Sequence, residues 1–294
     1  MRISNRGAQE RLLQHVQTAS TRLAETQERL ASGRRINRPS DDPFATARVL
    51  QARSQLDNVG QHIQTADLAT TELSAVETQL NSLGQVLTRA QELAVQADSA
   101  ALNGDARSQI ATEVDQLINE VLSIANTSYS GRRIFGGHQG VAPFVPDNPA
   151  YPTTMTFQGD AGQVLREIGD GETVAVNLDG APLFDDVFTS LIAFRDALRT
   201  NDRTAMNAAA GDIGREIDTV LTARGDVGAR MRRLESAWAR LADEELSLRA
   251  LISGLEEVDI TAEVVELQTR DTAFQAALSA TGRSLGHSLL DFLR

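Results

Sequence analysis

The four histidines are the side chains in this sequence that first suggest a metal site or an acid–base catalyst. Each stands in a different segment, and none belongs to a metal-binding pattern such as His-Glu-x-x-His; the four are His15, His62, His138 and His287. The chain contains no cysteine, which excludes a thiolate nucleophile, a disulfide and a cysteine-based zinc site. We find no strand-to-helix turn that would present a serine nucleophile. We therefore predict that the protein is not an enzyme and has no catalytic residue and no bound metal.

Two aspartate pairs, Asp41-Asp42 and Asp185-Asp186, are the candidate ligands for calcium. Neither has the alternating Asp/Asn spacing and the distal Glu of a calcium-binding loop. Both precede helical patterns, where a carboxylate caps free backbone N–H groups and meets the positive end of the helix dipole. The stretch "FGGHQG" at 135–140 lacks the G-x-G-x-x-G spacing of a phosphate-binding turn, so we interpret it as a loop that enters a β insertion. The sequence thus predicts no cofactor.

Both ends of the chain carry a heptad-like spacing of apolar residues. The seam near the N-terminus has Thr26 as a polar member, and its main apolar residues are Leu12, Val16, Leu23 and Leu30. The stripe near the C-terminus includes Leu267, Phe274, Leu278 and Leu285. So narrow a seam is typical of a coiled-coil partner, and a helix that exposes it to water is marginally stable. We expect the two ends to pair with each other or with neighbouring subunits; an ordinary closed bundle with docked ends is the alternative.

Breaks in this pattern divide the chain into five parts. Residues 1–42 form a terminal helix and a joint, and residues 43–140 form a long helical hairpin that turns at "NGD", 103–105. Residues 141–184 hold five of the seven prolines and short β-type runs, which predict a small β domain. Returning helices occupy 185–257, and a second terminal helix occupies 258–294 after a joint at "SGLEEVD", 253–259. The predicted fold is mainly α, an elongated antiparallel helical bundle with a small β insertion.

The joint "SGRRINRPSDDP", residues 32–43, combines a helix stop with a helix start. Gly33 can take the left-handed conformation that ends a helix. Asp42 is a predicted N-cap with Pro43 at the first helical position, and the neighbouring Asp41 is also predicted to cap the start of this helix. Pro39 limits the freedom of the segment before it. The arginines between stop and start suggest a salt-bridging contact with acidic surface on a neighbour, and a solvated linker is the alternative; they are Arg34, Arg35 and Arg38.

Charge and hydropathy limit the partners. The net charge is −12, which argues against nucleic-acid binding, because neutralising phosphates requires a basic surface. All 28 basic residues are arginine. No stretch has the roughly 20 apolar residues of a membrane helix, and the N-terminal segment has no apolar run of signal-peptide length. We expect a protein that does not bind membranes and, if exported, does not use a cleaved signal.

Three segments carry a resemblance to a known family: "ERLASGRRINRPSDDP", "GRRIFGG" and the ending "VDITAEVVELQTRDTAFQAALSATGRSLGHSLLDFL". Together with the coiled-coil body they resemble the flagellin superfamily, over essentially the whole chain. The forms "RPSDDP" and "SLLDFL" are similar to the members that join the flagellar hook to the filament. Arg133 and Ile134 depart from the family pattern, which usually has Tyr and Leu there.

The resemblance implies a structural subunit of the bacterial flagellum, extracellular and exported through the flagellar type III channel. It implies terminal helices that order on assembly. The implied partners are copies of the same chain in a ring-like homo-oligomer, flagellin, hook-associated protein 1 and an export chaperone that binds around 264–289. The alternatives are a flagellin that builds the filament and, more remotely, a secreted effector or binding module whose β region carries activity.

Overall fold

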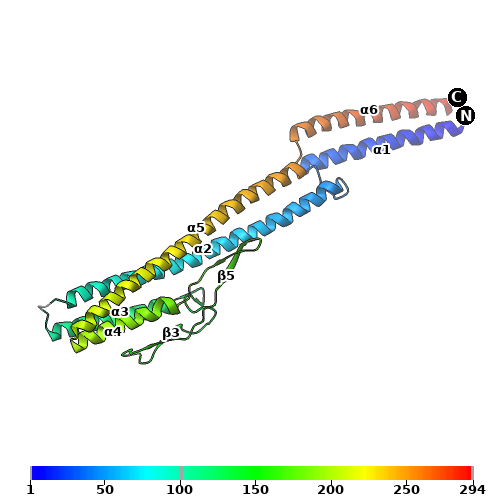
Figure 1. Cartoon of the computed structure of the whole chain (residues 1–294). Helices are drawn as coiled ribbons and strands as arrows, with labels where there is room; N and C mark the ends of the chain where they lie inside the picture. Colours follow the sequence, from blue (N-terminus) through cyan, green and yellow to red (C-terminus); the bar gives the residue numbers. More distant parts are fainter. Residues whose placement is uncertain (1, 100–101, 293–294) are drawn as a thin grey trace. The chain divides into compact units, whose positions relative to one another are not determined.

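The chain folds into two compact units, which are described separately. The computed structural model describes residues 2–99 and 102–292, with side chains for 10–99 and 102–283. One unit combines residues 1–58 with 244–294, and the other comprises residues 59–243. The helices are α1 (Arg2–Ser32), α2 (Pro43–Ala97), α3 (Gly104–Ala125), α4 (Ala181–Thr200), α5 (Arg203–Glu256) and α6 (Ile260–Phe292) (Figure 1).

In the terminal unit, α1 and α6 lie side by side and run in opposite directions (Figure 1). The heptad spacing explains the pairing, because residues three and four apart share one face of a helix. Thr26 is fully buried in this seam, and its hydroxyl donates to the carbonyl oxygen of Arg22 at 3.0 Å. A polar residue is tolerated there because its hydrogen bond is made within its own helix.

The second unit is a bundle of α3, α4 and the adjoining parts of α2 and α5 around one apolar core. Leucine, valine, isoleucine and alanine from the helices fill the core, and its fully buried members include Leu73, Leu80, Leu83, Leu87, Ile118 and Leu191. Asn103 begins α3 as the N-cap, with its side chain accepting the N–H of Ala106 at 2.9 Å. Packing of aliphatic side chains between helices therefore supplies most of the core.

The β insertion consists of three antiparallel strand pairs in the described chain. They are β1–β2 (Ser128–Tyr129 with Arg132–Arg133), β3–β4 (Phe144–Pro146 with Met155–Phe157) and β5–β6 (Leu165–Gly169 with Glu172–Ala175). Phe144 packs its ring against Phe157, Phe184 and Phe188, with centroids 5.1 to 5.6 Å apart. This cluster attaches β3–β4 to α4. The mainly α fold with a small β insertion is confirmed.

Two local expectations are wrong. The predicted joint at 253–259 is shorter, because α5 continues through Ser253 and Gly254 to Glu256. One glycine in a long helix costs only about 1 kcal/mol and does not end it when the flanking turns are packed. The pair Asp185-Asp186 lies inside α4, which begins at Ala181. Asp179 precedes this helix instead and accepts the N–H of Ala181 at 3.1 Å.

Candidate functional site

The structure gives no support to a catalytic or metal centre in the described part of the chain. No group of three or more His, Asp or Glu side chains there is arranged to hold a metal ion. His62 faces only Asp170, with Nε2 3.6 Å from Oδ1, and the side chain of His287 lies outside the described residues. The letters G-x-S-x-G do occur at 282–286, but they lie inside α6 and not at the strand-to-helix turn that a nucleophile requires. Within the described residues no helix is apolar over a length that would cross a bilayer.

The seam between α1 and α6 contains charged residues as well as apolar ones. Leu12, Val16, Leu23 and Leu30 are half-buried along α1. The half-buried positions of α6 repeat at heptad spacing: Glu263, Leu267, Arg270, Phe274 and Ala277. Two of these five residues, Glu263 and Arg270, are charged. A pair of helices with such a mixed seam buries little apolar surface, so it gains little free energy from its own packing.

The structure corrects the pairing predicted for Leu278. Its side chain is 47% exposed, while the preceding Ala277 is half-buried on the face towards α1. The apolar stripe of α6 is therefore broader than the seam, and part of it faces solvent. Exposed members of this stripe are Ile260, Val264, Val265 and Leu278. The side chain of Leu285 lies outside the described residues.

The joint between α1 and α2 is held by local capping. Gly33 follows α1 with a φ of +68°, a left-handed conformation that favours glycine. Asp41 accepts the backbone N–H groups of Asn37 at 3.1 Å and Arg38 at 2.8 Å. Asp42 accepts the N–H of Ala45 at 2.9 Å, and α2 begins at Pro43. Pro39 is exposed between these caps. The joint is thus a defined turn and not a loose linker.

Backbone hydrogen bonds tie this joint to the end of α5. Arg34 forms an isolated antiparallel bridge with Glu257, and the N–H of Arg35 donates to the carbonyl oxygen of Glu256 at 2.6 Å. The N–H of Val258 donates to the carbonyl oxygen of Gly33 at 3.1 Å. The joint between α1 and α2 and the connection between α5 and α6 are therefore hydrogen-bonded to each other, and each stabilises the other.

The three joint arginines have different surroundings. Arg35 donates to the carbonyl oxygen of Leu255 at 2.8 Å, and Arg38 lies 3.2 Å from Glu28. Arg34 is exposed, and its guanidinium makes no hydrogen bond or ion pair within the described residues. Of the three arginines expected to contact a neighbouring subunit, only Arg34 remains a candidate, because Arg35 and Arg38 already have partners inside the chain.

Sequence reasoning missed two ion pairs that hold this unit together. Arg53 Nη2 lies 2.6 Å from Glu256 Oε2, and Arg29 Nη2 lies 2.7 Å from Glu263 Oε1. In each pair the partners are more than 200 residues apart in the sequence, so no spacing rule could have found them. Only the antiparallel return of the chain brings them together.

Two family models match this chain. The bacterial flagellin N-terminal helical region matches residues 3–140, and the bacterial flagellin C-terminal helical region matches residues 211–293. The region between them contains β3–β6, α4 and the start of α5. The protein belongs to the flagellin superfamily of structural proteins of the bacterial flagellum.

Within this superfamily, the chain is similar to proteins named flagellar hook-associated protein 3. The one from Escherichia coli is 27% identical over 292 residues, which cover 89% of this chain and 90% of its own length. The one from Salmonella typhimurium is 23% identical over 323 residues and covers both chains in full. The crystal structure of Bacillus cereus FlgL has a TM-score of 0.61 and 25% sequence identity, and it covers 69% of this chain and 99% of its own.

Proposed function

We propose that this protein joins the hook of the bacterial flagellum to the filament. The likeness to hook-associated protein 3 along nearly the whole chain supports this function. The turn Arg38-Pro39-Ser40-Asp41-Asp42-Pro43 supports it as well, because the proline-rich form resembles the junction proteins and not the filament subunit. The expected partners are copies of the chain in a ring, hook-associated protein 1 on the hook side and flagellin on the filament side. The expected location is extracellular.

Its mechanism is coupled folding and assembly of the terminal unit. The mixed seam between α1 and α6 gives the isolated pair little stability, while Val264, Val265 and Leu278 present apolar surface to solvent. Neighbouring copies would cover this surface and complete the fold, with α6 escorted before assembly by an export chaperone. The proposed interface comprises Leu12, Val16, Leu23, Leu30, Arg34, Leu267, Phe274, Leu278 and Leu285.

Limited proteolysis of the purified monomer tests the coupling. Both ends should be removed early and leave a resistant core of roughly 40 to 255, because cleavage follows the free energy of local opening. Resistance of both termini in a monodisperse monomer would contradict the mechanism. The same digestion of assembled flagella should leave the termini intact.

Deleting the gene tests the junction function itself. Without a junction protein, flagellin should be exported and accumulate as monomer in the medium, because it has no platform on which to polymerise. Hooks without filaments should be visible by electron microscopy. The alternative, a flagellin, predicts hooks without filaments and no secreted filament protein, so assaying the medium separates the two.

Substitution at the joint tests the role of Arg34. Arg34→Gln should leave the unfolding of the monomer unchanged, since the guanidinium has no partner among the described residues, but it should reduce motility. The matched control is Arg35→Gln, which removes the bond to Leu255 and should lower stability as well. Normal motility in the Arg34 variant would remove this residue from the interface.

A further inference from the structure

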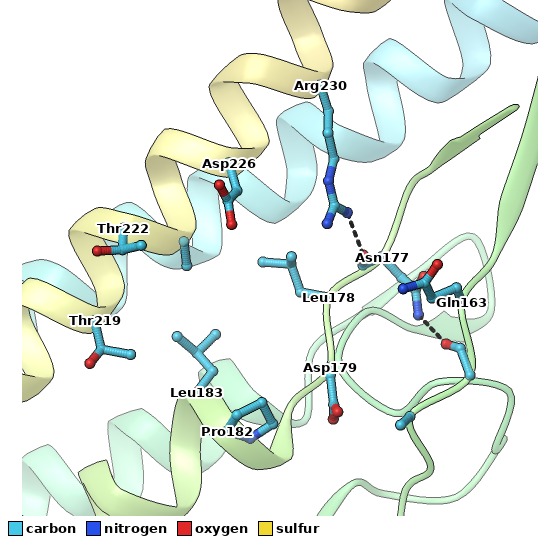
Figure 2. A pocket seen from close by; sticks show the side chains of 13 residues that line it. Gln163, Asn177, Leu178, Asp179, Pro182, Leu183, Thr219, Thr222, Asp226 and Arg230 are labelled. Atoms are coloured by element: carbon cyan, nitrogen blue, oxygen red, sulfur yellow. Dashed lines mark hydrogen bonds between the residues drawn. The ribbon is translucent and has the colours of Figure 1, made fainter. Parts of the chain in front are cut away.

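A surface cavity of about 530 Å³ lies between the β insertion and α5 in the second unit. Figure 2 shows Thr219, Thr222 and Asp226 on α5, across the cavity from Leu178 and Leu183. Its volume is in the range of about 300 to 1,000 Å³ that is usual for binding pockets. The three α5 residues are exposed, so the cavity is open to a partner.

One wall of the cavity is fixed by polar groups that already have their partners. Arg230 Nη1 donates to the carbonyl oxygens of Ala175 at 3.2 Å and Asn177 at 3.0 Å, and Figure 2 shows the bond to Asn177. Buried Asn177 donates to the carbonyl oxygen of Gly162 and accepts the N–H of Val164, both at 2.8 Å. These groups shape the cavity and leave little capacity for a ligand.

The remaining charged groups of the lining are two carboxylates, those of Asp179 and Asp226. The carboxylate of Asp226 has no hydrogen bond or ion pair within the described chain. Thr222 donates its hydroxyl hydrogen to the carbonyl oxygen of Asp218 at 2.9 Å, and Thr219 donates to that of Arg215 at 3.2 Å; Figure 2 shows both hydroxyls turned away from the cavity, so the two threonines present their methyl groups to it. Asp179 uses Oδ1 to accept the N–H of Ala181, which leaves its other oxygen free.

Arg230 contributes one positive charge to the lining, and carboxylates outside the lining add negative charge around it. Glu216 lies about one turn before Thr219 on α5, is only 8% exposed and makes no hydrogen bond or ion pair within the described residues. Burial raises its pKa, and the nearby carboxylate of Asp186 raises it further. Burial and the charges of Asp186 and Asp179 also raise the pKa of Asp185. Each of these carboxylates would gain from a nearby cation.

Apolar and acidic surfaces together determine the occupant. Leu178, Pro182, Leu183 and Ala223 offer contact to an aliphatic stem, and the acceptors require a donor-rich positive head. Arginine has this combination, with five N–H donors on a planar fork. A second copy of this chain can supply no lysine, because all 28 of its basic residues are arginine.

We propose that this cavity receives an arginine side chain from a second copy of the chain. The choice of a second copy as the donor of this arginine rests on the proposed function, since an assembly of repeated subunits places copies next to one another. The guanidinium groups of several exposed arginines make no hydrogen bond or ion pair within the described residues and are available as donors: those of Arg22, Arg34, Arg48, Arg232 and Arg283.

Binding of a free arginine analogue tests the chemistry without any assembly. N-acetyl-arginine methylamide added to the full-length monomer should shift the methyl NMR signals of Leu178 and Leu183, while the norleucine analogue should not. Asp226→Asn should weaken binding by up to about fivefold, as expected for loss of one exposed charged pair. The matched control is Asp218→Asn, which removes the same charge from α5 outside the cavity and should have little effect. Equal shifts from both analogues, or no shift, would overturn the proposal.

Photocrosslinking in isolated flagella tests the source. A benzophenone amino acid at position 222 should give a covalent dimer of this protein on a denaturing gel, and mass spectrometry of the dimer should place the crosslink at a peptide with one of these exposed arginines. A crosslink to a different protein, or none at all, would overturn the assignment to a second copy. Absence of the chain from flagella would instead contradict the junction function, and the NMR result would stand unaffected.

Discussion

The guanidinium carbon of Arg195 lies 3.9 Å from the ring centroid of Tyr151, and this contact joins α4 to the loop between β3 and β4. Arg195 is fully buried, and its Nη1 donates to the carbonyl oxygen of Pro152 at 2.6 Å. The ring stacks on the cation while Tyr151 Oη donates to Asp196 at 2.8 Å. One arginine thus satisfies the backbone of the insertion and anchors its aromatic residue.

Arg195→Met should therefore destabilise the second unit by about 3 kcal/mol, because it removes one partner of a buried charged cluster. The measurement is urea unfolding of the full chain. Arg199→Met is the matched control, since Arg199 lies over the same ring at 4.4 Å but its side chain is 38% exposed. Its cost should stay below about 1 kcal/mol. Similar losses in the two variants would show that burial is not the cause.

Glu72 connects α2 to two strand pairs of the insertion. It accepts Arg132 Nη2 at 3.0 Å and Arg166 Nη2 at 2.7 Å, and its side chain is only 13% exposed. Glu72→Gln should speed proteolysis within 128–175 severalfold, because loss of the carboxylate leaves two guanidinium groups poorly paired. The more exposed Glu113, paired with Arg89, is the control: Glu113→Gln should leave the cleavage rate unchanged.

Substitution of Gly33 tests the backbone conformation of the joint, and Gly60 within α2 serves as the comparison. Gly33→Ala should cost about 1 kcal/mol of stability in the terminal unit, because alanine is strained at a φ of +68° although no atom lies near its Cβ. Gly60→Ala places the same methyl in the interior of α2, also in open space, and should stabilise by about 0.5 to 1 kcal/mol. Thermal unfolding of the two variants should therefore shift in opposite directions. A gain from Gly33→Ala would contradict the structure of the joint.

Glu216 gives a prediction about pH. Its pKa is raised in the folded chain by burial and by Asp186, with Asp212 adding to the effect and Arg215 opposing it. Between the unfolded and folded pKa values only the folded state holds the proton, so stability falls as pH rises through this window. Glu216→Gln removes this penalty and should raise the melting temperature at pH 7, by roughly 2 to 4 °C for each kcal/mol gained.

The difference in stability between Glu216→Gln and the parent chain should disappear well below about pH 4, where the carboxyl of Glu216 is protonated in both the folded and the unfolded chain. Scanning calorimetry at the two pH values measures it. An equal difference in melting temperature at both pH values would show that the charge of Glu216 does not destabilise the fold. Asp218→Asn, on the exposed side of α5, provides the comparison for removing one acidic charge.

The helices, most of the apolar seam at the two chain ends and the caps of the joint could be predicted from the sequence alone. These features are local: they depend on residues three, four or seven apart, or on single residues such as Gly33 and Pro43 whose backbone preferences are intrinsic. The resemblance to flagellins also rested on local segments, and the family matches confirm it.

Which charged side chains have a partner within the chain depends on how the helices pack. The tertiary structure paired Arg53 with Glu256, gave Arg35 and Arg38 partners within the chain, and left Arg34 and Asp226 without one among the described residues. It also placed Leu178 across a cavity from α5. The physical reason is that burial and ion pairing depend on distances between residues far apart in sequence, and those distances exist only after the helices have packed.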